Sequence, residues 1–314
     1  MKHEFFNTIE QADIITIFRH VGADSDALGS QFGLKTWICD KYPDKCVYAL
    51  GEDIGSCANQ YPNIDHVDDD IIKKSLAIIL DTANTARIDD ERWILAAQTM
   101  KVDHHIQVEK FGNIQIVNEA AGATCEIIAT LLLNHQEKLS TQCATYLYSG
   151  LIADTLQFSI ASTTSKTLLA AAYLADCGIN IPNINQQNFT KSKKEYVYET
   201  YLRSHMRMKG EQIAYTIVTK KEYESFNLTL NEAKEKVYAF ANVEEFEIWA
   251  LFVENGVDAT GEVLFNGSLR SRNTAIDEIA NKYHGGGHKL ACGVKSLHEP
   301  EIECLLNELL QAIA

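Results

Sequence analysis

The stretch Leu76-Ala77-Ile78-Ile79-Leu80-Asp81 decides the fold, because an unbroken apolar run passes directly into a carboxylate. A short run of this kind, without polar alternation, is typical of a strand that is buried on both faces. Similar runs occupy 13–18, 46–50, 100–102 and 114–117, and helical patterns occupy 26–39, 123–133, 140–153 and 165–175. This order predicts an α/β domain with a mainly parallel sheet flanked by helices.

A second domain is expected after the composition changes near residue 178. An amide-rich stretch there is followed by a lysine-rich one, and we interpret 186–209 as a linker between a catalytic domain at 1–185 and a second domain at 210–314. Strand patterns then lie at 213–219, 248–253 and 259–265, and helical patterns at 230–240, 274–283 and 301–313. They predict a smaller α+β domain.

The charge balance limits the partners. With 43 acidic and 28 basic residues, the formal net charge is −15, whereas avid binding of duplex DNA needs a basic surface. A short anionic substrate stays possible, because bound cations invert the local potential. The N-terminus lacks the pattern of a signal peptide, and no apolar run approaches the ~20 residues of a membrane helix. We expect a cytoplasmic protein that binds neither duplex DNA nor a membrane.

Acidic and imidazole side chains follow the predicted strands where these end. The carboxyl ends of parallel strands meet at one edge of a sheet, so such side chains can converge although they are distant in sequence. Carboxylates mixed with imidazoles suit divalent cations, Mn²⁺ foremost, although the preferences of Mg²⁺ and Co²⁺ overlap with it. A pair of such ions would activate a water for displacement at phosphorus. The candidate ligands are His20, Asp24, Asp26, Asp81, His104 and Asp154.

The second domain carries a separate signal for anion binding. Gly285-Gly286-Gly287-His288 reads as a glycine-rich loop whose backbone amides can approach an anion, with an imidazole at its end. Upstream, Arg270 and Arg272 end a strand pattern with two guanidinium groups, which can bind phosphate in a bidentate manner.

These patterns together resemble the DHH phosphoesterases. His20-x-x-x-Asp24-x-Asp26, Asp81, Asp103-His104-His105 and Asp154 are similar to the four motifs of that family, in the same order. The segment 285–288 is similar to the signature of the DHH-associated domain that follows them, so the resemblance covers nearly the whole chain. Within the family, 81–88 and 268–272 are most similar to the stand-alone nanoRNase/pAp phosphatases of the NrnA type.

The resemblance implies a role for each candidate residue. One metal ion would be held by His20, Asp24 and Asp81, and the other by Asp26, Asp81, His104 and Asp154, with Asp81 bridging. His105 would lie beside the substrate phosphate and assist the leaving oxygen, and Asp103 would orient His104. The phosphates of the nucleotide would be bound by Arg270, Arg272, Gly285, Gly286, Gly287 and His288.

The expected activity is hydrolysis of short RNA oligonucleotides, or of the 3′-phosphate of pAp, by a monomer or homodimer. Two alternatives stay open, namely a phosphodiesterase that cleaves pApA from cyclic-dinucleotide turnover and a nucleotide sensor without catalysis. A family-II-like pyrophosphatase would share the motifs of the first domain but would have a different second domain, so the segment 285–288 argues against it.

Overall fold

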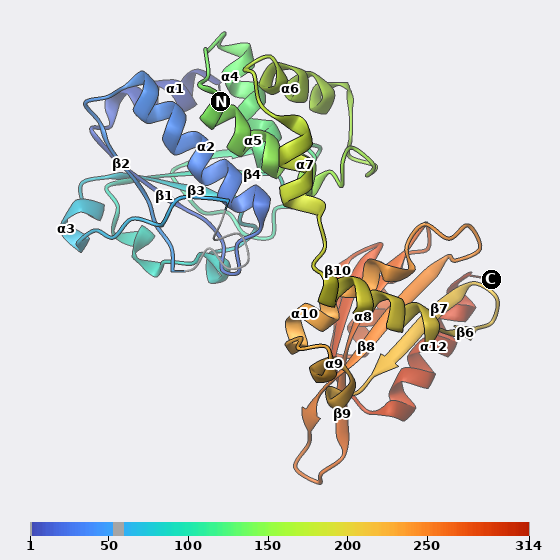
Figure 1. Cartoon of the computed structure of the whole chain (residues 1–314). Helices are drawn as coiled ribbons and strands as arrows, with labels where there is room; N and C mark the ends of the chain where they lie inside the picture. Colours follow the sequence, from blue (N-terminus) through green and yellow to red (C-terminus); the bar gives the residue numbers. More distant parts are fainter. Residues whose placement is uncertain (1, 53–59, 314) are drawn as a thin grey trace. The chain divides into compact units, whose positions relative to one another are not determined.

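The computed structural model describes residues 2–52 and 60–313, and the chain forms two compact units, Met1–Thr190 and Lys191–Ala314 (Figure 1). In the described ranges, no helix combines the length and the apolar character that crossing a bilayer requires. Each unit has its own sheet and its own core, and each is described by itself below.

The first unit is built on a parallel sheet of five strands in the order β2-β1-β3-β4-β5. The strands are β1 (Ile14–Phe18), β2 (Cys46–Ala49), β3 (Leu76–Leu80), β4 (Gln98–Asp103) and β5 (Ile114–Val117). Every residue of β3 is buried, as its continuous apolar run predicts. Ile78 and Leu80 join the larger core on one face of the sheet, whereas Ala77 and Ile79 join a smaller core on the other.

Helices flank this sheet (Figure 1). They are α1 (Lys2–Gln11), α2 (Ser25–Lys41), α3 (Asp69–Ile72), α4 (Thr124–Asn134), α5 (Thr141–Asp154), α6 (Ser165–Ala175) and α7 (Ile181–Phe189), with 3-10 turns η2 (Thr85–Arg87) and η3 (Glu91–Leu95). The expected parallel α/β architecture is confirmed.

Close packing of α2 against α5 depends on glycines. A Cβ on Gly29 would lie 2.6 Å from the Tyr146 carbonyl oxygen, and one on Gly150 would lie 2.8 Å from the Ser25 carbonyl oxygen and 2.9 Å from Asp26 Cα. Only glycine, which lacks a Cβ, permits this approach, since a Cβ atom is not found so close to another heavy atom. The approach brings the beginning of α2 close to the last turns of α5.

The second unit contains a mixed sheet of six strands in the order β10-β11-β9-β8-β7-β6, in which only the β7–β8 pair is parallel. Its strands are β6 (Arg207–Lys209), β7 (Ile213–Val218), β8 (Ile248–Val257), β9 (Val263–Ser271), β10 (Gly286–His288) and β11 (Ala291–Leu297). Its helices are α8 (Lys193–Ser204), α9 (Lys220–Ser225), α10 (Leu230–Lys234), η4 (Glu235–Phe240), α11 (Asp277–Lys282) and α12 (Glu299–Ile313).

Two local predictions in this unit are wrong. The glycine-rich segment at 285–288 was expected to be a loop, but Gly286–His288 forms the edge strand β10, which pairs with β11. The strand expected at 259–265 begins only at Val263. Asp258 explains this shift, because its Oδ1 accepts the amides of Thr260 and Glu262 and closes a turn before β9.

Candidate metal centre and active site

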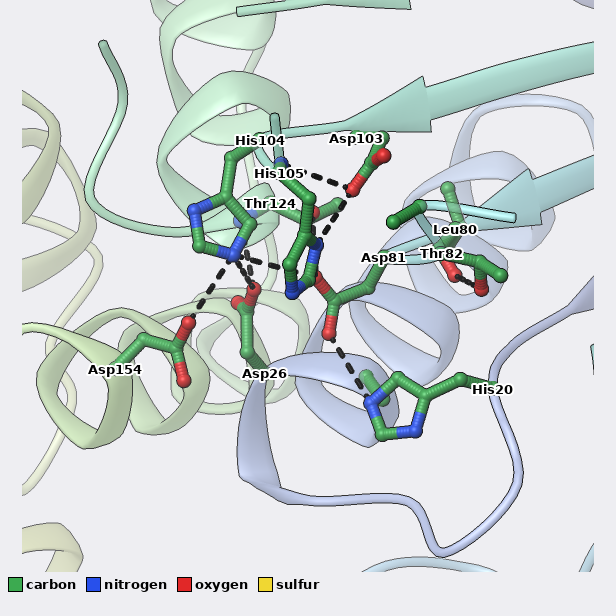
Figure 2. A network of polar contacts seen from close by, with 12 residues as sticks. His20, Asp26, Leu80, Asp81, Thr82, Asp103, His104, His105, Thr124 and Asp154 are labelled. Atoms are coloured by element: carbon green, nitrogen blue, oxygen red, sulfur yellow. Dashed lines mark hydrogen bonds and ion pairs between the residues drawn. The ribbon is translucent and has the colours of Figure 1, made fainter. Parts of the chain in front are cut away.

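The predicted ligands come from the ends of strands and helices of the first unit, and the structure brings them together (Figure 2). His20 follows β1, Asp81 follows β3, and Asp103 ends β4 just before His104 and His105. Asp24 is the N-cap of α2, Asp26 lies in its first turn, and Asp154 is the last residue of α5. Convergence at the carboxyl edge of the sheet is therefore achieved as the strand pattern predicts.

The first group of candidate ligands consists of His20, Asp24 and Asp81. His20 Nε2 lies 3.6 Å from Asp24 Oδ2 and 3.4 Å from Asp81 Oδ2. His20 Nδ1 lies 2.9 Å from the Val21 carbonyl oxygen, which can only accept, so we assign the proton to Nδ1. In the neutral ring, Nε2 would then have a lone pair directed toward the two carboxylates, as a metal ligand requires.

The second group consists of Asp26, His104 and Asp154. His104 Nε2 lies 3.2 Å from Asp154 Oδ2, 3.9 Å from Asp26 Oδ2 and 3.4 Å from Asp81 Oδ1. The other ring nitrogen, Nδ1, is 3.3 Å from the Ala121 carbonyl oxygen, so the ring of His104 repeats the arrangement of His20. The buried Nε2 atom has no hydrogen-bond partner among the described residues, which leaves it available for a cation.

Asp81 lies between the two groups and faces each with a different oxygen. Oδ2 faces His20, whereas Oδ1 faces His104 and accepts a hydrogen bond of 3.0 Å from Thr124 Oγ1. The side chain is 2% exposed, and the backbone of Asp81 has a φ of 56° in the left-handed region. This conformation is costly for a residue with a Cβ and is found where the surroundings enforce it, often at functional sites.

Asp26 also has a structural contact of its own. Its carboxylate accepts the backbone amides of Thr124 at 2.6 Å and Cys125 at 2.9 Å, the first two residues of α4. The N-cap residue of α4 is Ala123, whose methyl side chain cannot accept hydrogen bonds from these amides. A carboxylate from α2 therefore caps α4, and the helix dipole favours its negative charge.

The raised pKa values of three residues in the cluster indicate that its negative charge lacks a balancing positive charge. Burial opposes protonation of His20, but hydrogen bonds to Asp24 and Asp81 outweigh it and raise the pKa of the imidazole to about 10. Burial likewise opposes protonation of His104, and Asp154 and Asp81 raise its pKa to about 12. Burial, followed by the charges of Asp81 and Asp154, raises the pKa of Asp26 well above its usual range. Divalent cations would replace these protons, so the residues fit a pair of such ions.

His105 is held by Asp103 beside this cluster. Asp103 Oδ1 accepts hydrogen bonds from His105 Nδ1 at 2.8 Å and from the His105 backbone amide at 3.2 Å. Burial raises the pKa of the Asp103 carboxyl group, but these hydrogen bonds outweigh it and the net shift is downward. The expectation that Asp103 orients His104 is therefore corrected. A side chain at the end of β4 reaches the second following residue, whereas His104 is oriented by the Ala121 carbonyl group.

The predicted phosphate-binding residues of the second unit lie on and next to its sheet. Strand register places His288 opposite Ala291 and Ala291 opposite Arg270, so His288 and Arg270 share one face with a small residue between them. The next row on that face is Gly286, Gly293 and Ser268, and it lies in a cavity of about 340 Å³ that is also lined by Lys234, His284, Gly285 and Lys295. Gly287 lies between the two rows with a φ of 144°, and Arg272 donates to the Val243 carbonyl oxygen at 2.5 Å.

Sequence reasoning missed residues that contact the candidate ligands. Thr124 binds Asp81, and Lys101 forms an ion pair with Asp103. The hydrogen-bonding threonine lies at the start of an apolar helix, where nothing in the sequence pattern marks it. Arg87 places a guanidinium nitrogen 3.3 Å from His20 Nδ1, farther than the Val21 carbonyl oxygen at 2.9 Å.

Comparisons with known proteins agree with this geometry. The family model described as DHH family, N-terminal domain, matches residues 14–151. The chain is 35% identical over 301 residues to the probable bifunctional oligoribonuclease and PAP phosphatase NrnA of Streptococcus mutans, and the match covers 96% of this chain and 95% of that protein. It is 33% identical over 312 residues to the bifunctional oligoribonuclease and PAP phosphatase NrnA of Bacillus subtilis, with 98% and 97% covered.

Among solved structures, an exopolyphosphatase-related protein from Bacteroides fragilis matches with a TM-score of 0.83 at 24% identity, over 98% of this chain and 95% of that one. At this level of identity, the likeness describes the fold alone.

Proposed function

The chain belongs to the DHH family, and from that premise we propose that it is a metal-dependent phosphoesterase that hydrolyses short RNA oligonucleotides and the 3′-phosphate of pAp. The observation that carries the proposal is the position of Asp81, whose two oxygens face two separate groups of imidazole and carboxylate ligands. The names of the two relatives, which match over nearly their full lengths, support the choice of substrates.

The proposed cofactors are two divalent cations, Mn²⁺ foremost, because carboxylates and imidazoles form the ligand set without a thiolate. His20, Asp24 and Asp81 would hold one ion, and Asp26, Asp81, His104 and Asp154 the other. Bound ions of this kind lower the pKa of a water molecule and stabilise the entering and leaving oxygens at phosphorus.

His105 is proposed to assist the leaving oxygen. Its Nδ1 donates to the carboxylate of Asp103, which fixes the plane of the ring. When the ring carries a proton on both nitrogens, Nε2 can donate its proton to the oxygen that departs from phosphorus, and the ring is left protonated at Nδ1. The side chain of His105 is 27% exposed, so a substrate can reach it, whereas Asp103 is buried and acts through His105.

Residues of the second unit are proposed to bind the phosphates of the nucleotide, namely Arg270, Arg272, Gly285, Gly286, Gly287 and His288. The shared sheet face of Arg270 and His288, with Ala291 between them, supports this role. The guanidinium group of Arg270 also contacts the exposed ring of Tyr238, at 5.1 Å from its centroid, which holds it in place.

The test is a substrate panel with the full-length chain and Mn²⁺. Di- to pentanucleotide RNA, pAp and pApA are compared at matched concentrations, with Asp81→Asn as the inactive control. We expect turnover of the oligonucleotides and of pAp by the wild-type chain alone. Selective turnover of pApA would make it a cyclic-dinucleotide pathway enzyme instead, and tight binding of pAp without turnover under any divalent ion would make it a sensor.

A further inference from the structure

Lys101 is a fully buried lysine on the inner strand β4, which lies between β3 and β5. Its neighbour across the sheet is Ile79, and it faces the smaller core that includes Phe111. The side chain is 0% exposed, as is that of Asp103. A buried cation is costly to desolvate, and an apolar side chain of similar length would fill the same space without that cost. The presence of a lysine at this buried position therefore indicates that its positive charge has a role.

The contacts of the ammonium group all lead to segments that carry candidate active-site residues or lie beside them. Lys101 Nζ is 3.1 Å from Asp103 Oδ2, on the side of the carboxylate opposite to His105. It donates at 3.4 Å to the carbonyl oxygen of Ala83, in the loop that begins with Asp81. The ring of Phe111, with its centroid 4.4 Å away, closes the remaining side.

We propose that Lys101 is a positioning residue for the phosphoester reaction, which fixes the Asp103 carboxylate so that Asp103 holds Nδ1–H of His105 and directs Nε2 toward the leaving oxygen. The doubly protonated ring donates its Nε2 proton to that oxygen and is left as the tautomer protonated at Nδ1. The proposal rests on the proposed function. Its geometry is a row of three side chains, Lys101, Asp103 and His105, in which Asp103 Oδ2 forms the ion pair with Lys101 and Oδ1 accepts from His105. Lys101 does not contact the substrate or the metal ligands in this scheme, and its effect passes through Asp103.

The direct perturbation is Lys101→Met, which keeps the length of the side chain and removes the charge. Without the ammonium group, Asp103 Oδ2 is left buried without its cation, and the carboxylate is free to rotate away from His105. The double variant Lys101→Met/Asp103→Asn leaves no unpaired buried charge, and the amide oxygen can still accept from His105 Nδ1. Lys41→Met is the matched control, since it removes a lysine that pairs with Glu137 elsewhere in the same unit.

The kinetic readout separates positioning from general damage. We expect Lys101→Met to lower kcat on a dinucleotide by roughly 10- to 100-fold, as for other partners behind an active-site imidazole, with little change in KM. On a p-nitrophenyl ester of the same nucleotide the loss should largely disappear, because that anion leaves without protonation. The double variant should regain part of kcat, and Lys41→Met should behave as wild type.

A second readout does not depend on turnover. In the Mg²⁺-loaded chain labelled with ¹⁵N-histidine, the His105 signals are assigned by their loss in His105→Gln. For the neutral ring, which is the form left once Nε2 has given up its proton, we expect the tautomer protonated at Nδ1 in the wild-type chain and in Lys41→Met, and a mixture of tautomers in Lys101→Met. If Lys101→Met fails to fold, the double variant carries the test, and it should keep the wild-type tautomer.

The outcomes are distinguishable from a failure of the proposed function. A wild-type chain that hydrolyses none of the substrates overturns that function, while the His105 tautomers still report on Lys101. The inference about Lys101 is overturned if Lys101→Met keeps the wild-type tautomer, or if its kcat falls equally for both leaving groups. It is overturned as well if the double variant folds but shows the tautomer mixture.

Discussion

Asp26 is expected to stabilise the fold as well as to bind a metal ion, and the two roles can be separated in the metal-free chain. Its carboxylate accepts two backbone amides at the start of α4, both in the buried interior. In Asp26→Ala these two donors lose their acceptor. Each unsatisfied buried donor costs about 1–3 kcal/mol, and the lost charge at the helix N-terminus adds up to about 2 kcal/mol.

Relief of repulsion opposes this loss, because Asp81 and Asp154 disfavour the charge of Asp26 when no cation is bound. We expect a net decrease of about 2–5 kcal/mol in the free energy of unfolding of the first unit. Asp154 provides the comparison. Among the described contacts, it pairs with His104 and accepts no backbone amide, and it is 29% exposed. Asp154→Ala should therefore change the stability by less than about 1 kcal/mol, although it also removes a proposed ligand.

The assay is urea denaturation in EDTA at about pH 8, followed by tryptophan emission. Of the three tryptophans, Trp37 and Trp93 lie in the first unit and Trp249 in the second, so a Trp249→Phe background reports on the first unit alone. Asp26→Asn, which keeps one acceptor oxygen, should be intermediate. Equal unfolding midpoints for Asp26→Ala and Asp154→Ala would refute the assignment of Asp26 as the cap of α4.

Further outcomes follow from the same geometry. Asp81→Ala should abolish hydrolysis and release both ions, since each group loses a ligand, and retention of more than about a twentieth of the activity would contradict the bridging role. The pKa of His20 is raised from 6.5 to about 10 in the folded chain, so the stabilisation by its proton is complete below 6.5 and is lost as the pH rises toward 10. Denaturation in EDTA across this range should show the loss, and saturating Mn²⁺ should remove it because the cation binds the neutral ring. Gly150→Ala places a Cβ 2.4 Å from Cys125 Sγ, so it should lower both the Tm and kcat, and an unchanged Tm would show that α5 can move away from α2. Arg270→Gln should raise KM for pAp about 10-fold or more while kcat changes less, measured by initial rates.

The strands that could be predicted from sequence are those whose surroundings are uniform. The run at 76–80 coincides with β3, because a strand covered on both faces must be apolar at every position. The strand expected at 259–265 stops short of the end of β9, because polar residues alternate with apolar ones there. Asn266, Ser268 and Arg270 lie on one face, and only Gly267 and Leu269 face the apolar core. The strand Gly286–His288 has no apolar pattern at all, since its order comes from pairing with β11.

In the candidate site, too, some residues could be predicted from sequence and others could not. Groups at strand ends could be predicted, because topology alone brings those ends to one edge. The partners of these groups could not, because they depend on side-chain directions. The sequence Met100-Lys101-Val102-Asp103 suggests a lysine directed at solvent, and only the structure places it between Asp103 and the ring of Phe111.

Clustering acidic side chains normally opposes folding, and the positions of three of them reduce this cost. Asp24 accepts two amides in the first turn of α2, Asp26 accepts the first two amides of α4, and Asp81 accepts from Thr124. Each carboxylate thus satisfies donors that the fold would otherwise leave unpaired, whether or not a cation is bound. The imidazoles of His20 and His104 meanwhile carry protons that partly balance the negative charge. We therefore expect the chain to fold before metal binds, and binding to exchange protons for cations at proposed ligands that already hold their positions.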